Sequence, residues 1–205
     1  ETSQEFRQIQ REHAKSPPHV VIGNEAGDAD SIVSALTYAY IASIPGSSST
    51  QSPKRTPLVS IPREDLLTQR PETTVLLELA GLTTDDMKSN LLFVDDVITD
   101  EDNVHTNTKG SSVTLMDHNA LSDKFHSGEW KVVEILDHHV DMGQHIDTCP
   151  DRSHIAFADE KALVASTCTL VAEQWLEQQP QSPSSTKSKP LPPAVSIFCW
   201  EPLSW

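Results

Sequence analysis

The chain has 205 residues and a formal net charge of −15, with 37% apolar and 22% charged residues. This length suits one ordinary domain and part of a second, and the acidity argues against nonspecific binding to nucleic acid or to anionic membranes. The three cysteines are far apart and no stretch is long enough to span a bilayer, so we expect a cytoplasmic protein without a disulfide framework or a structural zinc site.

The first predicted elements form a strand, a loop and a helix. Residues 1–18 are polar and end in two prolines, so they predict a lead-in that stops before the first strand. The apolar run at 19–23 predicts that strand, and a polar loop follows it. An apolar stripe at helical spacing then predicts a helix that ends near residue 44 and is capped at its start by Asp30 or Ser31.

Further apolar runs predict more strands, with helical patterns between and after them. The strands are expected at 57–61, 91–94, 112–116 and 132–136, with a shorter one at 154–157. The helices are expected at 63–67, 72–79 and 162–178. This alternation predicts an α/β fold, a doubly wound, mainly parallel sheet with flanking helices. The domain is expected to cover 19–178, followed by a Pro/Ser-rich linker and tail at 179–205.

Acidic residues follow the first predicted strand. Asp28 and Asp30 stand two positions apart in a loop that enters a helix, where both carboxylates could point at one place. Asn24 could add a carbonyl oxygen to the same place. The alternative interpretation is structural: Asp30 caps the helix, and Asn24 and Gly27 form a turn.

The strand predicted at 112–116 is followed by Asp117, His118 and Asn119. Asp117 could bridge two cations through its two oxygens. His118 and Asn119 could then orient the residues that bind them. An ordinary Asp-His-Asn turn is the alternative.

The last strand of the predicted sheet is followed by Asp137, His138 and His139, which is the sharpest local signal in the chain. Adjacent histidines at a strand end can divide two tasks, because one can bind a metal ion while the other faces a substrate phosphate. An exposed polar pair without a function is the alternative. Asp95 and Asp96 also follow a strand, but for them solvation or capping of the next segment is favoured.

The carboxyl ends of parallel strands meet at one edge of a sheet, which is where open α/β sheets bind ligands. Aspartates and histidines gathered there would repel one another unless cations lay between them. Oxygen ligands with one or two imidazoles suit two ions of Mn²⁺ or Mg²⁺, with Co²⁺ as an alternative. Such a pair can activate a hydroxide for direct attack on a phosphoryl group, so the pattern predicts a metal-dependent phosphohydrolase.

Three segments together resemble the DHH phosphoesterase superfamily, and in particular its exopolyphosphatase and prune branch, which is related to type II inorganic pyrophosphatases. The segments are GNEAGDADSIVSALTYAY, LMDHN and EILDHHVDMG. Asn24 stands in place of a histidine, within Gly-Asn-Glu, which favours this branch. The resemblance covers about residues 19–178 and implies the fold of the superfamily's N-terminal domain.

The resemblance also implies a role for each residue of the set. Asp28 would bind one metal ion and Asp30 the other, while Asp117 would bridge both. His138 would be a further ligand, and His139 would contact the substrate phosphate. Asp117 and His139 would therefore act directly in catalysis. Three more residues would either bind metal or support the residues that do: Asn24, His118 and Asp137.

The implied activity is exopolyphosphatase-like, with release of terminal phosphate from inorganic polyphosphate or another small phosphate compound, and with no nucleic acid or membrane as partner. A pyrophosphatase, a cyclic-nucleotide phosphodiesterase and an inactive metal-binding or interaction module are the alternatives. The family supplies one more bridging aspartate after a later strand, and then a C-terminal DHHA2 domain. Neither follows Pro193 here, so we expect a truncated chain.

Overall fold

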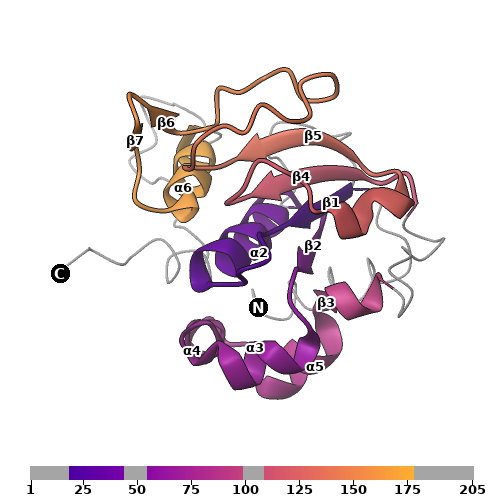
Figure 1. Ribbon diagram of the computed structural model, residues 1–205. Helices are drawn as coiled ribbons and strands as arrows, with labels where there is room; N and C mark the ends of the chain where they lie inside the picture. The colour runs from indigo at the N-terminus through magenta and orange to yellow at the C-terminus, as the bar shows by residue number, and fades with distance from the viewer. Residues whose placement is uncertain (1–18, 44–54, 99–108, 178–205) are drawn as a thin grey trace.

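The computed structural model describes residues 19–43, 55–98 and 109–177 (Figure 1). The expected lead-in and the expected tail lie outside these ranges. A sheet of five strands forms the centre, in the order β3-β2-β1-β4-β5. Its strands are β1 His19–Ile22, β2 Arg55–Val59, β3 Leu92–Phe93, β4 Ser112–Met116 and β5 Lys131–Leu136. All neighbouring pairs are parallel, as the near-continuous apolar runs predict.

The chain reverses its direction across the sheet between β1 and β4. It moves outward from β1 through β2 to β3, and then returns to place β4 on the other side of β1. The loops that follow β1 and β4 therefore start from adjacent strands and lead in opposite directions across the sheet. In open α/β sheets this switch point is the usual place for a ligand site.

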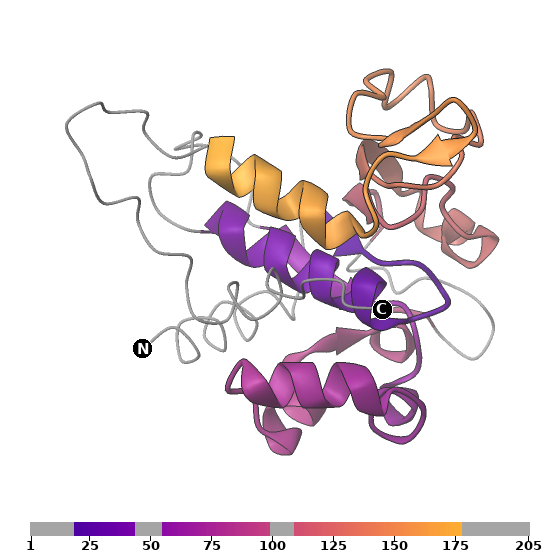
Figure 2. The ribbon, with the colours of Figure 1, turned by 90° about the vertical axis from the view of Figure 1, so that its left-hand side faces the viewer.

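Five α-helices accompany the sheet within the described ranges. They are α2 Ala29–Ser43, α3 Arg63–Gln69, α4 Pro71–Leu79, α5 Thr84–Asn90 and α6 Thr167–Glu177. Every residue of α2 from 31 to 41 is buried, because the helix lies between the sheet, α6 and the α3–α5 group. Figure 2 shows α2 and α6 side by side. None of these helices combines the length and apolar character that a membrane crossing requires.

The opposite face of the sheet is covered mainly by loops and two short 3₁₀ helices, η1 (Val94–Asp96) and η3 (Asp123–Gly128). Phe125 of η3 stacks on Trp130 with ring centroids 4.8 Å apart, and both pack against the strands. Apolar side chains thus pack against both faces of the sheet. The α/β fold expected from the sequence is confirmed.

Several element boundaries differ from the expected ones. The last helix begins at Thr167 rather than near residue 162, because Lys161–Ala162 (β7) pairs antiparallel with Phe157–Ala158 (β6). The second strand begins at Arg55, two residues earlier than expected. Two polar segments that gave no helical pattern form α5 and η3.

Candidate metal centre

The acidic and histidine residues expected to form a site follow β1, β4 and β5, three neighbouring strands. Because these strands are parallel, their carboxyl ends lie at the same edge of the sheet. One potential ligand atom from each of Asp117, His138 and His139 lies within 4.8 Å of the other two. Asp30 joins this group, since its Oδ2 lies 3.6 Å from Nε2 of His138. Residues from distant parts of the chain thus converge where the topology switches.

Asp117 lies at the middle of the cluster and is only 2% exposed. Its backbone is left-handed, with φ of 64°, which lets the chain turn sharply as it leaves β4. Asn24 Nδ2 donates to Oδ2 of Asp117 at 2.8 Å. On the other oxygen, Thr167 Oγ1 donates to Oδ1 at 3.2 Å, and Nε2 of His138 lies 3.2 Å away.

The pKa of Asp117 is raised by its burial and by the neighbouring carboxylates. Burial is the largest cause, followed by the charges of Asp30 and Asp28, and together they raise the pKa of Asp117 to about 7. The carboxylates thus lie close enough to oppose one another's ionisation. A cation among them would relieve that opposition.

The loop after β1 is held by its own backbone. Asn24 Oδ1 accepts from the backbone N–H groups of Ala26 at 2.9 Å and Gly27 at 3.2 Å, so the expected turn forms. The amide oxygen of Asn24 is therefore engaged within the loop, and its amide nitrogen orients Asp117. Gly27 has φ of 59°, and a Cβ there would lie 2.4 Å from Cγ2 of Ile61.

The two aspartates of this loop cap different helices. Oδ1 of Asp28 accepts from the backbone N–H of Ser31 at 2.9 Å, so Asp28 caps α2 where we expected Asp30 or Ser31 to do so. Asp30 instead accepts from the start of α6: Ser166 Oγ donates to Oδ1 at 2.6 Å, and the N–H of Thr167 donates to Oδ2 at 3.0 Å. The site therefore includes the first turn of a helix 137 positions away in sequence.

His138 is oriented by the backbone. Its Nδ1 lies 3.1 Å from the carbonyl oxygen of Val164. A carbonyl oxygen only accepts, so Nδ1 carries a proton, and Nε2 is the ring nitrogen left to bind a metal ion. This nitrogen faces the carboxylate oxygens of Asp117 and Asp30. The arrangement matches metal-binding histidines, which donate their other N–H to a neighbouring acceptor.

Asp137 organises its two neighbours and is fully buried. Its Oδ1 accepts from the backbone N–H of His138 at 2.8 Å and from Nδ1 of His139 at 2.8 Å. Its Oδ2 accepts from Nδ2 of Asn119 at 2.5 Å. Both oxygens are thus engaged within the protein, and Asp137 fixes the His138–His139 pair.

The side chain of His139 is 55% exposed, so part of its ring faces solvent beside the cluster. Burial lowers the pKa of His139, but the hydrogen bond to Asp137 and the charges of Asp137 and Asp117 outweigh it, so the net pKa is raised. His139 therefore gains positive charge more readily than an isolated histidine. A cationic, partly exposed imidazole suits contact with an anionic group.

The other expected candidates lie elsewhere. Nδ1 of His118 donates to the carbonyl oxygen of Met116 at 2.9 Å, and its pKa is lowered, mainly by burial. Among the described residues, His118 is outside the group of potential ligand atoms. Asp96 accepts from the backbone N–H of Phe93 at 2.8 Å and pairs with Arg63, as the capping interpretation predicts.

Two supporting contacts carry no local sequence signal. Arg70, between α3 and α4, donates from Nε to the carbonyl oxygen of Gly27 at 2.8 Å and from Nη2 to that of Ala26. Thr167, at the start of α6, donates from its backbone N–H to Asp30 and from its hydroxyl to Asp117. Each contact joins segments distant in sequence, so no spacing pattern could have revealed it.

The donor set fits a divalent cation. Nε2 of His138 lies 3.2 Å from an oxygen of Asp117 and 3.6 Å from an oxygen of Asp30, so the three groups are close enough to share one cation. Carboxylate oxygens with one imidazole are the ligands preferred by ions such as Mn²⁺ and Mg²⁺ over thiol-loving ions.

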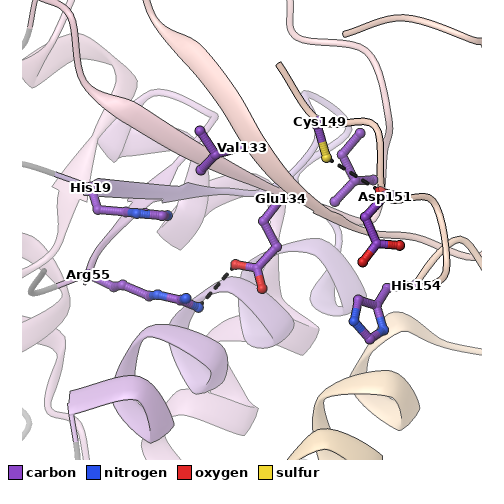
Figure 3. Close-up of a pocket in the computed structure, with 8 residues that line it drawn as sticks. His19, Arg55, Val133, Glu134, Cys149, Asp151 and His154 are labelled. Carbon is purple, nitrogen blue, oxygen red and sulfur yellow. Dashed lines mark hydrogen bonds and ion pairs between the residues drawn. The ribbon is translucent and has the colours of Figure 1, made fainter. Parts of the chain in front are cut away.

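A separate cavity of about 300 Å³ lies toward the opposite end of the sheet (Figure 3). His19 and Arg55, which begin β1 and β2, line it together with Glu134 of β5. Arg55 Nη1 pairs with Glu134 Oε2 at 3.1 Å, and Thr114 and Tyr38 also donate to that carboxylate. These side chains pair with one another, although Nε of Arg55 is buried without a hydrogen-bond partner among the described residues, and none of the expected site residues lines this cavity.

Comparison with known proteins gives a consistent result. The family model "DHH family, N-terminal domain" matches residues 18–194. "Exopolyphosphatase PRUNE1" of Homo sapiens and of Bos taurus are each 31% identical to this chain over 168 residues, which cover 80% of this chain and 32% of each relative. The "Putative exopolyphosphatase" of Schizosaccharomyces pombe is 31% identical over 157 residues, or 76% of this chain and 35% of the relative. This chain thus spans about a third of the length of these curated relatives.

Proposed function

This chain belongs to the DHH family, and we propose that it is an exopolyphosphatase-like, metal-dependent phosphohydrolase that releases terminal phosphate from inorganic polyphosphate. The observation that carries the proposal is the convergence of potential ligand atoms at one edge of the sheet, where Nε2 of His138 lies 3.2 Å from Asp117 Oδ1 and 3.6 Å from Asp30 Oδ2. The curated relatives named exopolyphosphatase support the choice of substrate.

The proposed metal ligands are those expected from the sequence. Asp28 would hold one Mn²⁺ or Mg²⁺ ion, Asp30 would hold the other, and Asp117 would bridge them, with His138 as a further ligand. When bound, such ions supply charge stabilisation for phosphoryl oxygens and lower the pKa of a water molecule. Asn24 supports this set, because its hydrogen bond to Asp117 Oδ2 fixes the plane of that carboxylate.

His139 is the proposed contact for the substrate phosphate. Its ring is partly exposed, and Asp137 holds Nδ1 at 2.8 Å, so Nε2 is the nitrogen left to meet a substrate. Because its pKa is raised, the imidazole can carry positive charge as it donates to a phosphoryl oxygen. Such a donor lowers the cost of the negative charge that develops during phosphoryl transfer.

The direct test uses the purified chain, stripped with EDTA and then supplied with Mn²⁺. We expect it to bind Mn²⁺ in calorimetry and to release phosphate from polyphosphate, while Asp117→Asn reduces both. Asp123→Asn, at an exposed aspartate of η3, is the matched control and should behave like the wild type. Failure to bind Mn²⁺ would contradict the metal site, whereas tight binding without phosphate release would contradict the enzymatic proposal.

A further inference from the structure

The start of α6 makes more contacts with the candidate metal centre than a helix cap needs. The first N–H groups of any helix lack partners within the helix. Here the carboxylate of Asp30 accepts from the N–H of Thr167 at 3.0 Å, the N–H of Cys168 at 3.2 Å and Ser166 Oγ at 2.6 Å. These three bonds cap α6, and the positive end of the helix dipole favours the negative charge of Asp30.

One further bond lies outside that cap. Thr167 Oγ1 donates to Oδ1 of Asp117 at 3.2 Å. This is the same oxygen that faces Nε2 of His138 at 3.2 Å. Thr167 is fully buried, so its hydroxyl depends on this protein partner rather than on solvent. Capping of α6 would be complete without it.

We propose that Thr167 is a positioning residue for the metal centre, which holds Asp30 through its backbone N–H and Asp117 through its hydroxyl. One rigid residue thereby sets the separation of two carboxylates that come from different strand ends. The hydroxyl also fixes which oxygen of Asp117 remains beside His138, because Asn24 holds the other. This inference depends on the proposed role of Asp30 and Asp117 as metal ligands, but on no particular substrate.

The alternative is that Thr167 serves only the fold. A purely structural hydroxyl would stabilise the protein whether or not metal is present, and its loss would leave the affinity for metal unchanged. A positioning hydroxyl would change that affinity, because groups that orient metal ligands typically contribute about 10-fold to 100-fold to metal binding. The affinity for Mn²⁺ therefore separates the two roles.

The test compares three variants of the whole chain by calorimetric titration with Mn²⁺ after EDTA treatment. Thr167→Val keeps the shape and the backbone N–H but removes the hydroxyl, and Thr167→Ser keeps the hydroxyl. Thr169→Val makes the same chemical change at an exposed position of α6. We expect Thr167→Val to bind Mn²⁺ about 10-fold more weakly or worse, and the other two variants to bind as the wild type does.

Thermal melting in EDTA checks that each variant is folded, and Thr167→Ala replaces Thr167→Val if the latter does not fold. Unchanged Mn²⁺ affinity in the folded hydroxyl-less variant would overturn the inference, and so would an equal loss in Thr169→Val or in Thr167→Ser. If the wild type itself binds no Mn²⁺, the proposed function fails first, which distinguishes that failure from a failure of this inference.

Discussion

The position of Asp117 in the candidate centre conflicts with the ionisation of its carboxyl group. Its left-handed backbone and its burial hold the carboxyl among other acids, at the cost of a pKa raised to about 7. Asparagine adopts the same backbone conformation readily. Replacement of Asp117 by Asn therefore removes the charge without adding backbone strain.

Asp117 predicts a pH dependence for the metal-free protein. Its pKa is about 7 in the folded state and near 3.8 in an unconstrained chain, so the folded state keeps a proton across that window. The contribution of Asp117 to the free energy of unfolding must then fall as the pH rises from about 4 to about 7. In EDTA we expect urea denaturation to show that Asp117→Asn gains stability relative to the wild type as the pH rises through this range. Asp123→Asn should retain the wild-type slope, and parallel slopes in all three proteins would refute the prediction.

Gly27 predicts a difference between two glycine substitutions. Gly27 and Gly143 both have positive φ, of 59° and 66°, so alanine costs backbone free energy of about 1 kcal/mol at each. Only at Gly27 would the added Cβ meet a neighbour, Cγ2 of Ile61 at 2.4 Å, and such overpacking costs about 1–3 kcal/mol more. Chemical denaturation should show Gly27→Ala to be the more destabilised variant by that margin. Equal losses of unfolding free energy in Gly27→Ala and Gly143→Ala would contradict the prediction, because they would show that the loop can move away from Ile61 without cost.

At the scale of elements, the strands and α2 were predictable because their signal is local. Each strand is an apolar run, and α2 follows a loop rich in turn-forming residues. The start of α6 was missed, since Asp30, which is remote in sequence, shares the capping of its first N–H groups with the local Ser166. The polar helix α5 was missed for another reason: its stability depends on the capping box between Thr83 and Asp86 and on Met87, a single fully buried side chain.

The same distinction applies to the site. Clusters at strand ends could be predicted because parallel topology gathers them at one edge. The sequence could not predict which atom of each side chain makes a contact, because that depends on the direction in which the side chain points. Asn24 thus offers its nitrogen, not its oxygen, to the centre, and Asp137 uses both oxygens within the protein.

The cluster at the start of β1 and β2 predicts a stability effect that is separate from metal binding. Arg55 pairs with Glu134 at 3.1 Å and lies over the ring of Tyr38 at 4.7 Å. Arg55→Met would leave the half-buried Glu134 without its cation, which we expect to cost about 1–3 kcal/mol in urea denaturation. Calorimetry should show unchanged Mn²⁺ affinity. Lys131→Met, an exposed change on β5, controls for the lost charge, and an equal effect there would refute the assignment.

For the whole molecule, cations should contribute to stability because their proposed ligands come from separate segments. A ligand that binds only the folded state at 100 times its dissociation constant stabilises it by about 2.7 kcal/mol. We therefore expect saturating Mn²⁺ to raise the urea midpoint of the wild type and EDTA to reverse that rise. Asp117→Asn should lose most of the response. A midpoint indifferent to Mn²⁺ would contradict a cation held by the fold.

The hydrogen bond from Asn24 to Asp117 joins residues 93 positions apart, and it can form only after β1 and β4 have paired. The entropy cost of closing the loop between these strands therefore arises before the carboxylates of the site come together. A newly synthesised chain would therefore bind the proposed cations as a late event, once α6 has left the ribosome. Interactions formed after the folding transition state slow unfolding rather than speed folding. Cations bound at that late stage would therefore slow the unfolding of the molecule rather than speed its folding.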